Sequence, residues 1–133
     1  MTIDDSLFEE LIGSTTITAH VGGRIYRGWR PQESKTPCIS FLRISTTPLN
    51  GNTGDSGTHN ARIQVDVWAK TAKSARTIAD AVRALLNGWQ STSPASSQTL
   101  CVADVDMVEP PEEGAGQPEY RVSQDYSIWY SAS

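Results

Sequence analysis

Three residues whose side chains could perform nucleophilic catalysis stand close together in the chain: Asp55, Ser56 and His59. A carboxylate, a hydroxyl and an imidazole act as a catalytic triad when a rigid frame fixes all three beside an oxyanion hole. Here they belong to the stretch TTPLNGNTGDSGTH (residues 46–59), which holds three glycines and a proline and has almost nothing to bury. Because such a stretch provides no rigid frame, we expect no catalytic triad.

The same glycines could form a phosphate-binding loop. Such a loop leads into a helix N-terminus, and a lysine often follows its glycines. This one leads into a strand pattern that begins near Asn60, and it contains no lysine. We therefore expect residues 46–59 to be a long mobile loop between two antiparallel strands, and loops of this length are often functional.

Residues that could bind a metal ion are present, but their spacing is unfavourable. His20 and His59 are isolated from one another, which does not fit a zinc site. The carboxylates nearer the C-terminal end match no calcium loop and are interrupted by prolines, so a solvated acidic turn is the better interpretation. These carboxylates are Asp104, Asp106, Glu109, Glu112 and Glu113.

The two cysteines, Cys38 and Cys101, each lie in an apolar strand-like run without a ligand partner nearby. We expect buried thiols, as in a reducing cytoplasm, and neither a disulfide nor a metal pair. These patterns together predict a protein with no cofactor, no metal and no enzymatic activity.

The clearest structural element is a strand that passes directly into a helix. Along residues 62–69, Ile63, Val65 and Val67 alternate with polar residues and Trp68, which predicts a half-buried strand. The spacing then changes to that of an amphipathic helix, whose apolar face holds Ala75, Ile78, Ala79, Val82, Leu85 and Leu86. Thr71 is suited to cap the start of this helix, and Gly88 is suited to the left-handed residue that ends it.

The segments before this unit read as one short helix and two extended pieces. Residues 2–12 predict a helix capped by Thr2, with Asp4 and Asp5 at its positive end. We expect residues 17–21 to form a linker or an irregular turn. We expect residues 24–29 to form a short extended piece and residues 32–37 to form a polar loop. Residues 38–45 are apolar on both faces, which is typical of a central strand.

The segments after the helix predict two strands. A Ser-rich connector at 90–98 leads to a strand at 99–108, and an acidic turn at 109–119 leads to a strand at 120–131. In the first of these strands, alternation predicts one face made of Cys101, Ala103, Val105 and Met107. The order α-β-β-β-α-β-β predicts a single α+β domain over residues 1–133. Its antiparallel or mixed sheet has about four or five strands, an amphipathic helix packed on one face and a short N-terminal helix.

The charges are divided unevenly along the chain. Its 11 basic and 15 acidic groups give a net charge of −4. Residues 1–83 carry 10 basic and 8 acidic groups, a net charge of +2, and residues 84–133 carry 1 basic and 7 acidic groups, a net charge of −6. This division fits an ordinary acidic soluble protein or a two-signed surface for head-to-tail packing of identical subunits. The net negative charge disfavours specific nucleic-acid binding, and no apolar run is long enough to span a membrane.

The aromatic residues outside the expected core are candidates for a subunit interface. By alternation, Trp68 and Trp129 face away from Val65 and Ile128, and Trp29 lies beside Arg30 in a loop rich in Gly and Pro. Large aromatics and arginine are enriched in such interfaces. We therefore name Trp29, Arg30, Trp68 and Trp129 as candidate interface residues. In the alternative interpretation, a second helix covers that face of the sheet and buries them.

Three stretches in this order resemble a known family: GGRIYRGWRPQESKTPCISFLRIS, RIQVDVWAKTAKSARTIADAVRALL and RVSQDYSIWY. They look like the tail-completion or tail-terminator proteins of long-tailed, siphovirus-like bacteriophages. The resemblance covers most of the chain, from about Leu7 to Tyr130. It marks positions of the fold and carries over no catalytic residue.

This resemblance implies a structural virion protein of the tail or neck, assembled in the host cytoplasm. Its copies would form a ring, typically hexameric, that caps the tail tube, stops its polymerisation and joins it to the head connector or stopper protein, with DNA only passing through. We expect contacts with the tube or connector at Leu49, Asn50, Asn52, Asp55, His59 and Phe8. The alternatives are a head-closure or connector-adaptor protein, or a small cytoplasmic ligand-binding domain that uses the acidic turn.

Overall fold

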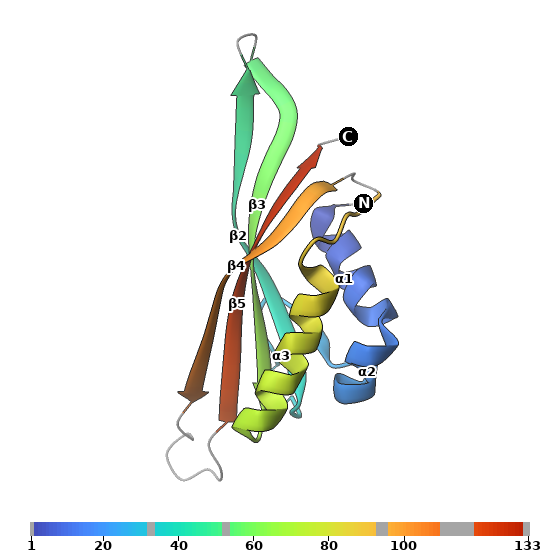
Figure 1. Cartoon of the computed structure of the whole chain (residues 1–133), viewed down its shortest axis with the longest axis vertical. Coiled ribbons are helices and arrows are strands. Elements are labelled where there is room, and N and C mark those ends of the chain that lie inside the picture. Colours follow the sequence, from blue (N-terminus) through green and yellow to red (C-terminus); the bar gives the residue numbers. More distant parts are fainter. Residues whose placement is uncertain (1, 32–33, 52–53, 93–95, 110–118, 132–133) are drawn as a thin grey trace.

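The computed structural model describes residues 2–31, 34–51, 54–92, 96–109 and 119–131. The elements follow one another as α1 (Ile3–Gly13), α2 (Thr15–Val21), β1 (Ile25–Arg27), β2 (Cys38–Gly51), β3 (Gly54–Ala69), α3 (Ala72–Leu86), β4 (Ser96–Glu109) and β5 (Glu119–Ser131). The sheet has the strand order β1-β2-β3-β5-β4, with β1 parallel to β2 and the other neighbours antiparallel. The three helices lie on one side of this sheet (Figure 1). The predicted α+β class is confirmed.

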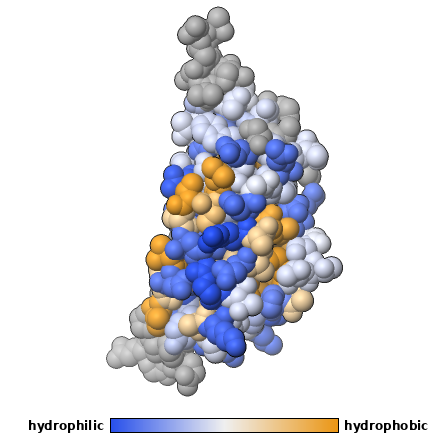
Figure 2. Space-filling model, in the orientation of Figure 1, coloured by the Kyte–Doolittle hydropathy of each residue, from blue (hydrophilic) through white to orange (hydrophobic). Residues whose placement is uncertain are grey.

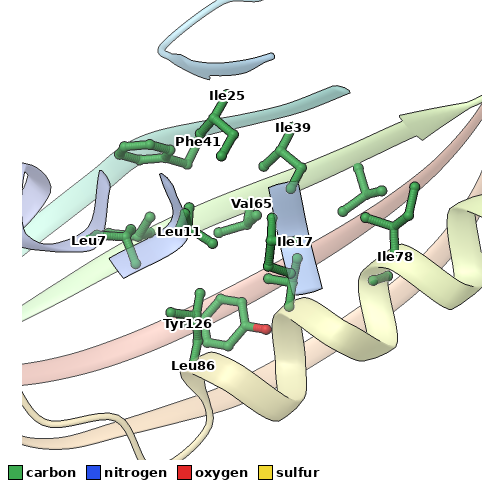
Figure 3. Packing of buried hydrophobic residues seen from close by; sticks show 14 of the residues in the cluster. Leu7, Leu11, Ile17, Ile25, Ile39, Phe41, Val65, Ile78, Leu86 and Tyr126 are labelled. Carbon is green, nitrogen blue, oxygen red and sulfur yellow. The ribbon is translucent and has the colours of Figure 1, made fainter. Parts of the chain in front are cut away.

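The hydrophobic core lies between the helices and the inner face of the sheet (Figure 3). Ile63, Val65 and Val67 of β3 are fully buried, and so are Ile78 and Leu86 of α3. Burying one such side chain stabilises the folded state by about 1.5 to 3 kcal/mol before the entropy of ordering is subtracted. The alternation predicted for β3 and the helical face predicted for α3 therefore meet in one core.

The caps predicted for α3 are present. The Thr71 hydroxyl accepts a hydrogen bond from the Ser74 N–H at 3.1 Å, which satisfies one of the free donors of the first turn. Asn87 caps the other end, and Gly88 follows it with φ of +88°. A side chain at that φ would be strained, so glycine suits the position where the chain leaves the helix.

The N-terminal helix begins as predicted, but a second helix follows it. Thr2 and Asp5 form a capping box at the start of α1, with the Thr2 N–H donating to Asp5 at 2.9 Å and the Asp5 N–H donating to Thr2 at 3.1 Å. The prediction of a linker or irregular turn at 17–21 is wrong. Ser14 caps α2 there, and the helix buries Ile17 and Val21. Seven residues are too few to show a helical period in the sequence, so tertiary packing decides this element.

Residues 46–51 and 54–59 are strand residues and not a loop, and residues 52–53 lie outside the described residues. Leu49 pairs with Thr58 and Asn50 pairs with Asp55, so β2 and β3 continue as a paired hairpin that projects from the body of the molecule (Figure 1). The ladder depends on backbone N–H and C=O groups, which need no apolar side chains. The register shifts between Leu49 and Asn50, which pair with Thr58 and Asp55. Gly57 lies between these two partners with φ of +81°, so glycine provides the left-handed backbone conformation at this irregularity in the ladder. The expectation that the stretch joins antiparallel neighbours is confirmed.

The prediction of a central strand at 38–45 is only half right. β2 is second in the sheet, and β1 pairs with it only from Ile39 to Phe41. Ile39 and Phe41 are buried, whereas Leu42 and Ile44 are exposed. The central strand is β3, because it pairs with both β2 and β5 along most of its length.

The faces predicted for the strand at 99–108 are wrong beyond Val102. The register shifts between Cys101 and Ala103, because Cys101 is opposite Tyr126 and Ala103 is opposite Asp125. Since side chains alternate with a period of two, one extra residue moves all later side chains to the other face. Asp104 and Asp106 consequently share the inner face with Cys101.

The Ser-rich connector is shorter than predicted, because residues 96–98 already belong to β4. Ser91 and Ser96 are buried, and the Ser91 N–H donates to the Ser96 hydroxyl. The acidic turn at 109–119 lies almost wholly outside the described residues. Among the described helices, none combines the length and the apolar character needed to cross a lipid bilayer.

The capping box gives a prediction for acid stability. Hydrogen bonds from the Thr2 N–H and from Arg27 lower the pKa of Asp5 from 3.8 to about 2. A carboxylate with a lowered pKa stabilises the fold above its unfolded pKa and loses that contribution as the pH falls toward its folded pKa. We therefore expect Asp5→Asn to lower the free energy of unfolding at pH 6, and the difference from wild type to shrink between about pH 4 and about pH 2.

Urea unfolding followed by circular dichroism at several pH values measures this difference. Glu9→Gln, which changes an exposed carboxylate further along α1, serves as the control. A difference between wild type and Asp5→Asn that stays constant from pH 6 to pH 2 would contradict the prediction.

Candidate interaction surface

The outer face of the sheet is the main surface that the described helices leave uncovered. Alternation along β3 and β5 turns two groups of residues to this face, because their neighbours Val67 and Val122 are buried in the core. The first group is Asn60, Arg62, Gln64, Asp66 and Trp68, and the second is Arg121, Ser123, Asp125, Ser127 and Trp129. The alternative that a second helix covers this face is wrong for the part of the chain that the structure describes, because α1, α2 and α3 all pack on the opposite face.

Hydrogen bonds and an ion pair link the polar side chains in the middle of this face. The Asn60 amide donates to the Ser127 hydroxyl at 2.7 Å, and Arg62 lies 3.7 Å from Asp125. The Gln64 amide donates to Asp66 on the same strand at 3.1 Å. These side chains are exposed or half-buried, so this face of the sheet tolerates contact with water.

At one end of this face, two arginines stack on a tryptophan. The guanidinium carbon of Arg30 lies 4.9 Å from the centre of the Trp68 ring, and that of Arg121 lies 5.1 Å from it. Arg30 also contacts Glu119 at 3.2 Å and donates to the Ser34 hydroxyl at 2.8 Å. Cation–π contacts of this kind stabilise exposed sites by about 0.5 to 1 kcal/mol each. We refer to Arg30, Trp68, Glu119 and Arg121 as the Trp68 cluster.

The Trp68 cluster covers one of the two cysteines. Cys38 lies opposite Trp68 in the β2–β3 ladder and is fully buried. Burial raises the pKa of the Cys38 thiol, and it raises that of the half-buried Cys101 thiol as well. Both residues are free cysteines in the structure. The prediction of a buried thiol is confirmed for Cys38, and Cys101 lies at the edge of the core.

The structure brings together only two of the four candidate interface residues. Arg30 and Trp68 meet in the Trp68 cluster. Trp129 is opposite Asn60, toward the other end of the outer face. Trp29 follows β1 and is 89% exposed, the highest exposure among the large hydrophobic side chains described. Sequence reasoning missed Arg121 and Glu119, although the alternation of β5 places Arg121 on the same face as Trp129.

The candidate contact residues for the tail tube and connector also divide into two places. Leu49, Asn50 and Asp55 lie in the projecting hairpin, and Asn52 lies outside the described residues. His59 lies nearer the body, with its ring stacked on Tyr130 at 5.6 Å. Phe8 is on α1, where it packs against the core and the Arg27 guanidinium lies 5.0 Å from its ring centre.

A buried polar network links α3, β4 and β5, and sequence reasoning missed its central residue. The Tyr126 hydroxyl donates to the side-chain amide oxygen of Gln124 at 2.8 Å, and the side-chain N–H groups of Gln124 donate to the Ala79 backbone carbonyl at 2.9 Å and to the Asp104 carboxylate at 3.3 Å. Gln124 is fully buried. The signal in the sequence was its position between Val122 and Tyr126, which alternation assigns to the buried face.

Two of the carboxylates considered for metal binding, Asp104 and Asp106, are held by arginine, and Glu112 and Glu113 lie outside the described residues. Arg76 donates to Asp104 at 2.8 Å and to Asp106 at 2.7 Å, and it also contacts Asp80 at 3.2 Å. Burial opposes the charged form of Arg76, but the hydrogen bond to Asp104 and the surrounding carboxylates outweigh it and raise the pKa of Arg76. The described residues contain no group of three or more His, Cys, Asp or Glu placed to hold a metal ion. Asp104 and Asp106 thus fix α3 to β4.

Comparison with known proteins adds family information to this geometry. The model of the family described as tail completion protein gp17 matches residues 5–131. No curated protein sequence matches the chain. A chain in the solved virion of a native gene transfer agent particle has the same fold, with a TM-score of 0.77 and 14% sequence identity over 97% of this chain and 94% of that one. A second solved chain has a TM-score of 0.52 and 17% identity over 96% of both chains.

The polar network gives a prediction for stability. Tyr126→Phe removes the hydroxyl that donates to Gln124 and leaves a buried amide oxygen without that partner. We expect the free energy of unfolding to fall by about 1 to 2 kcal/mol, measured by urea unfolding. Tyr130→Phe on the same strand, where the side chain is only partly buried, serves as the control and should change it by less than about 0.5 kcal/mol. If the two substitutions lowered the free energy of unfolding equally, the hydrogen bond from Tyr126 to Gln124 would contribute no more to stability than the partly buried Tyr130 hydroxyl does.

Proposed function

The chain belongs to the family of the tail completion protein gp17, and from this premise we propose that it is the subunit of a tail-terminator ring. In this proposal the ring caps the finished tail tube, stops its polymerisation and joins it to the head connector. The observation that carries the proposal is the family match, which spans residues 5–131 and thus all but the first residues of the folded chain. The likeness of fold to a chain of the gene transfer agent virion supports it.

The surfaces of the chain support a role in protein contacts. None of the described helices packs on the outer face of the sheet, and the Trp68 cluster places an aromatic ring and two arginines there. Buried aromatics and arginines dominate binding energy in protein interfaces. We propose that Trp29, Arg30, Trp68 and Trp129 contact neighbouring subunits, with Trp68 and Arg30 acting as one unit because they already stack on each other.

The projecting hairpin supports a contact with the tail tube or the connector. It extends from the body of the molecule and is held by the paired backbone of β2 and β3, so it can reach a neighbour above or below the ring (Figure 1). We propose that Leu49, Asn50, Asn52, Asp55 and His59 make this contact. We also propose that Phe8 contacts the tail tube or the connector. Phe8 lies on α1, at a place on the surface separate from the hairpin.

The acidic half of the chain supports a position near the path of the DNA. Residues 84–133 carry a net charge of −6, and β4 and β5 form most of this half. DNA slides past a surface of like charge without being held, because it finds few positive groups to replace its counterions. We propose that DNA only passes through the ring and is not bound specifically.

A head-closure or connector-adaptor subunit is the neighbouring possibility, since it would use the same kind of surfaces at the other side of the neck. The family description names tail completion, which favours the tail side. Electron cryomicroscopy of assembled particles separates the two positions, because a terminator contacts the last ring of the tail tube and an adaptor contacts the connector alone.

The first measurement is the mass of the purified chain by light scattering, alone and with its tail-tube protein. The single chain has a mass of 14.5 kDa. We expect a ring-sized species several times that mass, in the protein alone or on addition of the tube protein. A monomer under both conditions would overturn the proposed function.

The hairpin can be tested separately from the ring. Replacing residues 50–55 with the two-residue turn Asn-Gly shortens the hairpin and keeps a turn suited to antiparallel strands. We expect this variant to assemble as the wild type does and to bind tail tubes at least 10-fold more weakly in a co-sedimentation assay. A variant with Lys73→Ala and Thr77→Ala on the exposed side of α3 is the control. Unchanged binding by the shortened variant would show that the hairpin is not the contact.

A further inference from the structure

The bulge at Val102 decides which side chains of β4 point into the protein. With the bulge, Asp104 and Asp106 lie on the inner face, opposite two buried residues of β5. Val105 and Met107 lie on the outer face, and Val105 is 49% exposed. Figure 2 shows hydrophobic residues at the surface on the side of the molecule where Figure 1 draws β4. This arrangement reverses the usual one, in which the apolar side chains of a strand face the core and the charged ones face water.

A register of β4 without the bulge would turn the apolar side chains inward. The bulge follows the pairing of Cys101 with Tyr126. If each later residue moved by one position along β5, Val105 would be opposite the buried Val122. Met107, two residues further along the strand, would point to the same side. This second register would restore the apolar inner face that the alternation of residues in β4 predicts.

The same register would turn the acidic side chains outward. Asp104 would be opposite Ser123, and Asp106 would be opposite Arg121, both on the outer face of the sheet. Opposite charges on directly opposed residues of two strands stabilise their pairing. The carboxylates of β4 would therefore have a favourable position in the second register as well.

The core leaves room for an apolar side chain beside Val122. A pocket of about 130 Å³ lies there, between the beginning of α3, the end of β4 and the beginning of β5. Two alanines near the beginning of α3 line it, and their side chains are short. Asp106 is opposite Val122, but its carboxylate reaches outward to Arg76 and is 64% exposed. The pocket thus lies where Val105 would point in the second register.

Arg76 and Asp104 hold β4 in the bulged register. The Asp104 side chain is only 15% exposed and accepts hydrogen bonds from Arg76 at 2.8 and 2.9 Å. It also accepts one from Arg83 at 3.4 Å and one from Gln124 at 3.3 Å. Arg76 donates to Asp106 as well, at 2.7 Å. Hydrogen bonds between charged groups are stronger than neutral ones, and β4 would lose these if it changed register.

We propose that residues 102–108 of β4 can take two registers, and that the pairing of Arg76 with Asp104 selects the bulged one. The beginning of the strand keeps its place in both registers, because the Gly88 N–H at the end of α3 donates to the Thr99 carbonyl at 2.7 Å. Only the second half of the strand changes its partners on β5. This inference concerns the fold of a single chain and holds whether or not the proposed ring forms.

The register decides what β4 contributes to the outer face of the sheet. In the bulged register Val105 and Met107 lie there, and the Met107 sulfur accepts a hydrogen bond from Arg121 of the Trp68 cluster at 2.9 Å. In the second register the two carboxylates of this stretch take their place. An ion pair on the helix side of the sheet thus determines whether the strand presents apolar or acidic side chains on the opposite side.

Nuclear magnetic resonance of the isotope-labelled full chain tests this proposal, because opposed residues of antiparallel strands are close enough to give nuclear Overhauser contacts. Arg76→Met removes the cation and keeps a residue suited to a helix. Asp104→Asn, the second variant, removes the charge from β4 itself. Asp80→Asn is the matched control, since it removes the third carboxylate that contacts Arg76 and leaves both contacts with β4. Circular dichroism checks that each variant folds.

We expect contacts between Val105 and Ser123 in the wild type and in the control. In both test variants we expect these contacts to be lost, and contacts of Val105 with Val122 and of Asp106 with Arg121 to replace them. A test variant that folds and keeps the contact between Val105 and Ser123 would overturn the proposal.

The remaining outcomes also decide the question. If one test variant unfolds, the register of the other gives the answer. If both unfold, β4 has no second register to adopt, and the proposal is overturned. If the Asp80→Asn control changes register, the selection does not depend on the pairing of Arg76 with Asp104, and the role proposed for that pair is overturned.

Discussion

The alternation of apolar and polar residues along β3 and β5 is the constraint on which the structure depends. Ile63, Val65 and Val67 point to one side and are fully buried, and the residues between them point to the other side and are polar or aromatic. A sheet with this pattern can bury only one face. The helices therefore gather on that face, and the opposite face is left for water or for other proteins.

A single extra residue in β4 has large consequences within this frame. The bulge at Val102 turns Asp104 and Asp106 toward the helix side, where Arg76 reaches both carboxylates. Gln124 then connects Asp104, the Ala79 carbonyl and Tyr126. Burial raises the pKa of Tyr126 well above its usual range, so the hydroxyl keeps the proton that it donates to Gln124. The network fixes the position of α3 on the sheet with polar contacts, whereas the rest of the α3 interface is apolar.

The features proposed to act in assembly all lie outside the core. The hairpin projects beyond the helices, the Trp68 cluster occupies one end of the outer face, and exposed hydrophobic side chains lie on β2 and β4. None of them is needed to bury the apolar residues of a single copy. Their positions are consistent with the proposed contacts with neighbouring proteins.

The sequence by itself determined the α+β class, the amphipathic α3 with its Thr71 cap, the helix α1, and the alternation of β3 and β5. These elements follow from periodicity and capping, which are local properties of the chain. The family resemblance rested on three stretches that cover β1, part of β2, part of β3, α3 and most of β5, and it is confirmed. The tertiary structure alone decided α2, the extension of the strands through residues 46–51 and 54–59, and the faces of β4. A seven-residue helix has too few residues to show a period, a ladder forms through backbone groups that carry no sequence signal, and a bulge is set by the partner strand. The Trp68 cluster arises in the same way, because Arg30, Glu119 and Arg121 come from distant parts of the chain and meet Trp68 only when the sheet is complete.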